Sequence, residues 1–539
     1  MTTKTGLLNK DKGSRNPQDF GFLNNLRKMG LEPTRHECHK ILSLARLPIP
    51  TLPRTSIIIT IDLEIVKLKL IERNKMIENT QIQLAELPQP QFSQKAEPID
   101  LTKDTIVWRY QQVCERMRER GLDVLIVYAD REHGGNFAYL TGFVPRFEEA
   151  LLVLHRNGEA FLLLGNEMLR MAEYSRIPVK AVHVPQFSLP NQPTSGCSLG
   201  EALKKAGVRK AYRIGIAGWK LLKTERKEEG YLNFDVPYYI VHSVGYLAGF
   251  RCIEPATDLF IDPARGLRVR MNANEIAHYE YGSSLASEGM RSLLNHIKPG
   301  MTELELASFL EQEGQPNTVQ TICASGERFT DAVVSPRNKV IQRGDRFSAT
   351  VGYAGGLTNR TAYVAGDEKD LPEKEKDYVQ KVAVPYFQAM SSWYEKIETG
   401  ACAGAIYELI EKIVPHEQYG WTLNPGHFIA DEEWLSSPFF PYSSIHLGSG
   451  MILQMDLILK VPGYGGCNAE DGVVIMNASL QEQMRHQYPK VWKRLNSRKE
   501  YMKDVLGICL KEDVFPMSDL CGYVRPYLLN KTVNFCLKK

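Results

Sequence analysis

The sequence has almost no net charge. Its 539 residues include 66 basic and 63 acidic side chains, which leave a formal charge of +3 at pH 7. Proteins that bind nucleic acid or anionic membranes through bulk electrostatics carry a strongly basic surface. We therefore expect neither nucleic acid nor a membrane among its partners. The apolar content of 43% and the charged content of 24% are those of an ordinary globular protein.

Long apolar runs and paired cysteines are also missing. The apolar run Ser56–Ile61 is stopped by Asp62 and is far shorter than the roughly 20 residues that cross a bilayer. None of the ten cysteines forms a C-x-x-C pair, which argues against a zinc knot or a thioredoxin-like site. No signal peptide is recognisable, so we expect free thiols in a reducing cytoplasm.

Residues 1–104 show little of the periodicity that predicts packed helices or strands. Lys, Arg, Asn and Pro punctuate the beginning, and residues 81–98 are rich in Gln and Pro, as linkers are. We expect this leader to be poorly ordered. The segment His36–His39 contains potential metal ligands, but no second pair accompanies it, so it is interpreted as a solvated cluster.

Residues 105–265 alternate helical and strand patterns. Apolar residues recur at helical spacing over 108–120, and Gly121 stands where a helix would end. Buried strands are predicted at 123–128, 150–154, 160–164 and 212–216. Strands that alternate with helices predict a small α/β domain.

Residues 266–480 predict a second domain that mixes helices and strands. A long helical pattern covers 274–297 and ends at a Lys-Pro-Gly sequence. Thr302 and Glu305 then form a capping box, in which each side chain satisfies the backbone N–H of the other. The next helix is therefore expected to begin at this point.

The rest of the second domain follows the same logic. Gly355 and the glycine after it predict a tight hairpin turn, because glycine tolerates a positive φ. Helices are predicted at 373–395 and 405–413, and further strands at 426–476. Residues 481–539 begin with a charged helical pattern, and we expect a helical extension that packs on the body or acts as a dimer arm.

Several motifs follow one another along the chain: Asn136–Phe143, Gly344-Asp345, Gly426-His427-Phe428-Ile429, Gly450–Asp456 and Ala469–Ile475. Their order and spacing resemble those of the creatinase, Xaa-Pro aminopeptidase and prolidase family. The resemblance covers roughly residues 105–480. It implies an α/β N-terminal creatinase-like domain and an α+β pita-bread catalytic domain, with N- and C-terminal extensions.

The stretch between Asp345 and Asp367 contains no acidic residue, although the resemblance places two metal-binding aspartates here. The first position is Thr350. The second is Leu357 in the frame set by the following Arg-Thr pair, or Thr361 in an ungapped alignment. Neither threonine nor leucine neutralises a dication as a carboxylate does. We therefore expect no dinuclear metal centre and no cofactor. The alternative is a single divalent ion such as Mn, Zn or Co.

Three positions of the ligand set that the resemblance implies keep suitable side chains: His427, Asp456 and Glu470. A histidine between two carboxylates suffices for general acid–base hydrolysis, and the same trio can bind one metal ion. The alternative without function is that the three side chains only form hydrogen bonds with one another in an inherited pocket.

Two histidines that the resemblance would supply are replaced. Trp434 stands seven residues after His427, where a second histidine is usual, and an indole cannot transfer a proton in its place. Trp434 is interpreted either as an aromatic wall for substrate or as a core residue. The catalytic histidine of creatinase falls at Val334, or at Val333 if the gap moves, so that mechanism does not transfer.

Three further residues are candidates for binding substrate: Asp331, Arg360 and His446. Arg360 is alternatively, and preferentially, the partner of a buried carboxylate, because buried charges need partners. His446 is alternatively a surface-loop histidine. The segment Asn136–Phe143 is interpreted as a strand edge or as a substrate contact.

The favoured hypothesis is a cytoplasmic hydrolase that cuts a C–N bond in a small molecule or short peptide without a dinuclear metal centre. His427 would be the acid–base group, and Asp456 and Glu470 would orient it or a water. One alternative is a mononuclear-metal peptidase of the Xaa-Pro aminopeptidase type, and another is a non-catalytic pita-bread binding protein. The resemblance also implies a homodimer.

Overall fold

The computed structural model describes residues 81–538 except 92–94, 193–194, 223–232 and 330–333. The predicted leader up to residue 80, with His36–His39, lies outside the described residues. Among the described helices, none combines the length and apolar composition that a membrane span needs.

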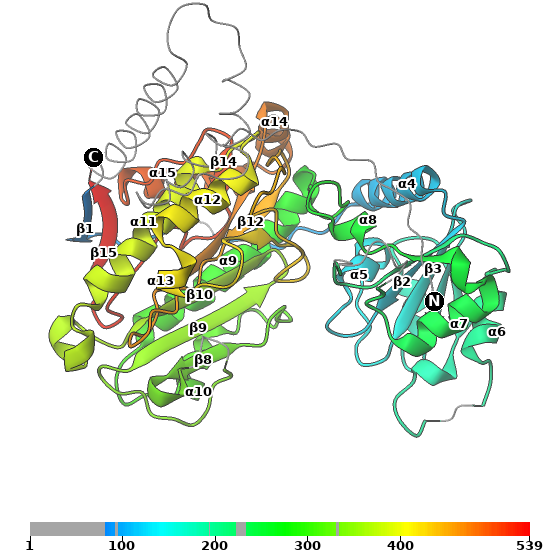
Figure 1. Cartoon of the computed structure of the whole chain (residues 1–539), viewed down its shortest axis with the longest axis horizontal. Coiled ribbons are helices and arrows are strands. Elements are labelled where there is room, and N and C mark those ends of the chain that lie inside the picture. The colour runs from blue at the N-terminus through cyan, green and yellow to red at the C-terminus, as the bar shows by residue number, and fades with distance from the viewer. Residues whose placement is uncertain (1–80, 92–94, 193–194, 223–232, 330–333, 539) are drawn as a thin grey trace, which may run out of the picture. The chain divides into compact units, whose positions relative to one another are not determined.

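The first domain is built on a six-stranded mixed sheet (Figure 1). The central strand β2 is apolar and fully buried, and it pairs antiparallel with β3 and parallel with β6. The strand order is β5-β4-β3-β2-β6-β7. The strands are β2 (Val124–Ala129), β3 (Ala150–His155), β4 (Ala160–Leu164), β5 (Lys180–His183), β6 (Ile214–Ala217) and β7 (Ile253–Pro255).

The helices of this domain end where local chemistry predicts. Helix α4 (Lys103–Arg120) is capped by the Thr102 side chain and ends at Gly121, whose φ of 71° is left-handed. The segment interpreted as a strand edge is helix α5 (Gly135–Thr141) instead, so that alternative is wrong. The other described α-helices of this domain are α6 (Leu199–Lys205), α7 (Tyr238–Ala248) and α8 (Asp258–Ile261).

The second domain is built on a seven-stranded sheet in the order β11-β12-β13-β10-β9-β8, with β14 also paired to β13. All of its ladders are antiparallel. The strands are β8 (Ile322–Ser325), β9 (Arg346–Tyr353), β10 (Gly356–Tyr363), β11 (His427–Phe428), β12 (Ile452–Met455), β13 (Asn468–Ile475) and β14 (Val514–Pro516).

Helices pack along this sheet (Figure 1). The long helix and the capping box predicted from the sequence are present as α9 and as the start of α10. The predicted helix at 373–395 begins with one short 3₁₀ turn (Glu373–Glu375) and a π-helical turn (Val379–Ala383) before α11. The helices are α9 (Ala273–His296), α10 (Glu303–Ala307), α11 (Val384–Lys396), α12 (Ala403–Ile413) and α13 (His416–Tyr419).

The β9–β10 hairpin lies directly on α9. This close contact explains why glycines stand at the turn and at the facing position of the helix. The turn consists of Ala354 and Gly355, and Gly355 has a φ of 98°. A Cβ on Gly282 of α9 would lie 2.0 Å from the Ala354 carbonyl oxygen. The predicted hairpin turn is confirmed, and the close contact fixes how the hairpin sits on the helix.

The ends of the described chain depart from the prediction. Strand β1 (Gln81–Glu86) falls in the predicted linker and pairs antiparallel with β15 (Val533–Lys538), the blue and red strands of Figure 1. The predicted helical extension contains α14 (Ala478–Gln487) and α15 (Pro489–Asp504), but it continues into β14 and β15. These strands satisfy their backbone N–H and C=O groups by pairing with a strand that is distant in the sequence. A local sequence pattern does not reveal such a partner.

Candidate active site

A row of polar side chains crosses the second sheet. Thr350 of β9 pairs with Asn359 of β10, and Asn359 pairs with Glu470 of β13. Met455 of β12 pairs with Asp471, so Asp456, the next residue, comes beside Glu470. Directly opposed residues in a ladder point to the same face. The sheet therefore lines up Thr350, Asn359 and Glu470 from three neighbouring strands with Asp456, the residue that follows β12.

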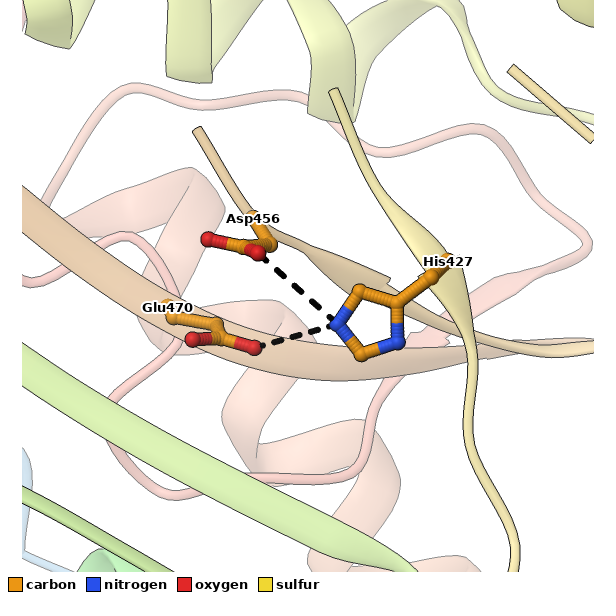
Figure 2. Close-up of side chains that lie close together, drawn as sticks. All are labelled: His427, Asp456 and Glu470. Atoms are coloured by element: carbon orange, nitrogen blue, oxygen red, sulfur yellow. Dashed lines mark hydrogen bonds and ion pairs between the residues drawn. The ribbon is translucent and has the colours of Figure 1, made fainter. Parts of the chain in front are cut away.

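His427 on β11 completes the predicted trio. Its Nε2 lies 3.3 Å from Glu470 Oε1 and 4.0 Å from Asp456 Oδ2 (Figure 2). Its Nδ1 lies 3.1 Å from the Phe428 carbonyl oxygen and donates to it. Because Nδ1 holds the proton in this arrangement, Nε2 presents its lone pair to the two carboxyl groups.

The trio is buried, and burial shapes its protonation. His427, Asp456 and Glu470 are 2%, 4% and 5% exposed as whole residues. Burial, and next the charge of Glu470, raises the pKa of Asp456 well above its ordinary value. Burial, and next the charge of Glu433, does the same to the pKa of Glu470. Burial lowers the pKa of His427. The site thus favours neutral forms of all three groups.

One oxygen of the trio has no hydrogen-bond partner. Asp456 Oδ1 is buried and unpaired, which is costly for a carboxyl oxygen. One ligand atom from each of the three residues can be chosen so that all lie within 4.8 Å of one another. An imidazole lone pair, two carboxylates and an unpaired oxygen fit a single divalent cation such as Zn or Mn.

A second cation does not fit the same row. The residue of β10 that faces the site is Asn359, which donates to Thr350 Oγ1 at 2.5 Å, and both side chains are neutral. Neither Leu357 nor Thr361, the positions predicted from the motif frames, lies opposite Thr350. The two-residue turn could have revealed this register, because counting outward from it pairs Thr350 with Asn359.

Trp434 covers one side of the trio. Its ring stacks on the His427 ring with centroids 4.1 Å apart, and its side chain remains 36% exposed. The interpretation of Trp434 as a core residue is therefore wrong, and it lies between the trio and solvent. Glu433, which was not among the predicted site residues, is half-buried beside it, and burial raises its pKa. Its position next to Trp434 was the only sequence signal for it.

The other predicted substrate contacts lie elsewhere. Arg360 is 3% exposed and donates to Asp471 Oδ2 at 2.7 Å and to the Leu520 carbonyl at 2.8 Å. It alternates with Asn359 along β10 and therefore points to the opposite face. His446 is exposed in a loop and forms an isolated bridge with Cys402. Asp331 lies outside the described residues.

A cavity of about 310 Å³ lies one step further along the sheet, and no residue of the row and no member of the trio lines it. Thr361 and Asn468 line it, and each is two residues from a member of the row, Asn359 and Glu470 respectively. Alternate residues of a strand share a face, so the cavity is on the side of the trio. Asn468 Nδ2 is buried without a hydrogen-bond partner, so a donor is available at this end.

Comparisons with known proteins agree with this architecture. The model of the Creatinase/Prolidase N-terminal domain matches residues 109–223, and that of Metallopeptidase family M24 matches residues 277–477. An uncharacterized peptidase of Bacillus subtilis is 25% identical over 218 residues, which are 39% of this chain and 60% of that protein. A Xaa-Pro dipeptidase of Pyrococcus horikoshii is 24% identical over 258 residues, 45% of this chain and 69% of that protein.

Solved structures show the same fold. The prolidase from Pyrococcus horikoshii OT3 superposes with a TM-score of 0.52 at 20% identity, covering 68% of this chain and 95% of that chain. A Xaa-Pro dipeptidase from Bacillus anthracis gives 0.52 at 18% identity, covering 69% and 96%. With its two domain matches and this fold, the chain belongs to the creatinase/prolidase family of pita-bread proteins.

Proposed function

We propose that this protein is a peptidase-like hydrolase that cleaves a C–N bond of a small amide or short peptide at His427, Asp456 and Glu470, with at most one divalent cation. The supporting observation is the trio itself: the Nε2 lone pair of His427 lies 3.3 Å from the buried Glu470 carboxyl group and 4.0 Å from that of Asp456. The neutral Thr350 and Asn359 across the sheet argue against a pair of cations.

The protonation of the trio suits acid–base chemistry. His427 Nε2 has the lone pair that accepts a proton from an attacking water. A carboxyl group with a raised pKa keeps a proton near neutral pH and can donate it to the departing nitrogen. We assign this role to Asp456, whose Oδ1 has no partner. The Phe428 carbonyl, which accepts from Nδ1, orients the imidazole, and Glu470, 3.3 Å from Nε2, would position the attacking water beside it.

The same residues would hold a metal ion if one binds. His427 Nε2 and the carboxylates of Asp456 and Glu470 would be the ligands, and the ion would supply positive charge that polarises the amide carbonyl. This is the peptidase alternative, and the names of the Xaa-Pro dipeptidase relatives support short peptides as substrates. The cavity of about 310 Å³ on the same face of the sheet is of a size for a small substrate.

A non-catalytic role remains the second candidate, because the Trp434 ring stacks directly on His427. In that case the trio would serve recognition. Homodimer formation and a cytoplasmic location stay predictions, to be checked by gel filtration and by cell fractionation.

The test combines metal analysis with hydrolysis assays on purified protein. Wild type is assayed on a panel of Xaa-Pro dipeptides, cyclic amides and amidines, with and without chelator. His427→Ala and Glu470→Gln are expected to lower turnover strongly, whereas Glu373→Gln, at an 84% exposed side chain, is the matched control. Removing a general acid–base group costs about 10²–10⁴-fold in rate.

The outcomes separate the candidates. Turnover that ignores chelator supports the metal-free hydrolase, and turnover that needs one bound ion per chain, lost in His427→Ala, supports the mononuclear peptidase. Two bound ions per chain would contradict the proposal. Absence of turnover across the panel, with a ligand or protein partner recovered, would favour the non-catalytic candidate.

A further inference from the structure

A short loop of the second domain carries the residues that cover the trio. Residues 430–434, here called the site loop, are closed by Phe428, which accepts from Leu435 at 3.0 Å and donates to Ser436 at 2.8 Å. The loop brings Trp434 onto the His427 ring and places Glu433 close enough to influence the pKa of His427. The loop therefore supplies both an aromatic ring and a carboxyl group that lie beside His427.

Two acidic side chains of the site loop are held by Arg268. Arg268 Nη1 donates to Glu432 Oε1 at 2.7 Å, and Nη2 donates to Asp431 Oδ2 at 2.9 Å and also to the second Glu432 oxygen. Tyr279 of α9 donates to the same Asp431 oxygen at 3.1 Å. The Arg268 side chain is 1% exposed, so its charge depends on these partners.

The first domain completes the arrangement. Asn136 accepts from Arg268 Nη1 at 2.8 Å, and its own Nδ2 donates to the Gly218 carbonyl at 2.8 Å. A Cβ on Gly135 would lie 1.9 Å from Glu432 Oε1, so only glycine leaves room for this carboxylate. The beginning of helix α5 thus forms one wall of the Glu432 site. Asn136 of the Asn136–Phe143 motif, which was considered as a substrate contact, thus has a structural role as a partner of Arg268.

Arginine is suited to hold a loop in one position. Its planar guanidinium binds two carboxylates with fixed direction, whereas a lysine ammonium is a point charge without that directionality. Buried ion pairs contribute more to a unique geometry than to net stability in the best-attested cases. The Arg268 contacts would thus fix the site loop in place more than they strengthen the fold.

We propose that Arg268, oriented by Asn136, is a positioning residue that sets Trp434 and Glu433 against His427 and so couples the first domain to the active site. The effect of Arg268 on catalysis rests on the proposed hydrolase function. The effect of Arg268 on the position of Trp434 does not, because that position can be measured without any substrate.

The test uses ¹⁹F NMR of the full chain labelled with 5-fluorotryptophan. The chain has six tryptophans, and the line absent from Trp434→Phe identifies Trp434. Arg268→Lys keeps the charge but removes the fork, and the Trp434 line is expected to shift or broaden. Asn136→Ala removes one contact of the guanidinium and is expected to move the same line by less.

Arg494→Lys is the matched control. Arg494 also forms a buried ion pair, with Glu280 at 2.8 Å, but contacts no residue of the site loop. It is expected to leave the Trp434 line in place, even if stability falls. A Trp434 line unchanged in both Arg268→Lys and Asn136→Ala would overturn the proposal.

Activity then supplies a second readout. If wild type is active, Arg268→Lys is expected to lower kcat/KM by about 10²-fold, since a misplacement of about 1 Å has that effect. Arg494→Lys is expected to retain wild-type kcat/KM at a temperature where it is folded. An inactive wild type would count against the proposed function, while the Trp434 line would still decide whether Arg268 positions the loop.

Discussion

Replacing Asp456 with asparagine tests the electrostatics of the site through protein stability. Asparagine has the same shape but cannot ionise. Asp456 is 4% exposed, and its pKa in the folded protein is raised by burial and by Glu470. The folded wild type therefore keeps a proton that the unfolded chain releases above the ordinary carboxyl pKa of about 4.

The sign and size follow from linkage. Stability changes with pH in proportion to the protons bound by the unfolded chain minus those bound by the folded protein. Here that difference is negative, so Asp456 makes wild type lose up to about 1.4 kcal/mol per pH unit. The loss begins near the ordinary carboxyl pKa and stops above the raised pKa of the folded state. Asp456→Asn escapes it, so its stability relative to wild type should rise with pH.

The assay is urea unfolding of metal-free protein in chelator at several pH values between about 5 and about 8. His427 acts in the opposite sense, because its pKa is lowered in the folded protein and stability is lost as pH falls below its ordinary value of about 6.5. Taking the difference between Asp456→Asn and wild type removes this contribution to first order. Glu373→Gln, at an exposed position, measures the background.

A difference between Asp456→Asn and wild type that stays flat, or falls, as pH rises would refute the reasoning. Such a result would mean that Asp456 is ionised in the folded protein at neutral pH. The role of Asp456 as proton donor would then be lost, although metal binding by the trio would not.

Two further substitutions test the packing around the site. Arg360→Met leaves Asp471 buried without its cation, and the free energy of unfolding in urea is expected to fall by about 3–5 kcal/mol. Gly282→Ala places a methyl group against the Ala354 carbonyl and is expected to lower the free energy of unfolding by about 1–3 kcal/mol, measured in the same way.

Each of these substitutions has a control of the same chemical kind. Arg343 pairs with Asp370 at a 57% exposed side chain, so Arg343→Met is expected to cost less than about 1 kcal/mol. Gly200 in α6 has no atom within 4 Å of a built Cβ, so Gly200→Ala is expected to stabilise by about 1 kcal/mol. Equal effects in a substitution and its control would show that burial and contact are not the cause.

Local chemistry made much of the architecture readable from the sequence. The left-handed Gly121 that ends α4, the capping box of Thr302 and the turn at Gly355 each depend on residues only a few positions apart. That His427, Asp456 and Glu470 lie close together was also expected in advance, because their motifs occur in the order and spacing of the family. Interactions within a few residues are encoded by those residues alone, so pattern and spacing suffice to predict them.

Long-range contacts could not be predicted in this way. The pairing of β1 with β15 joins residues more than 440 positions apart, and the Arg268 contacts with Asp431 and Glu432 span more than 160. Alternation along a strand shows which residues share a face, but not which partner they meet. That Asn359 faces Glu470 while Arg360 turns to Asp471 therefore emerged only when the strands were assembled, because sheet register depends on the packing of the whole domain.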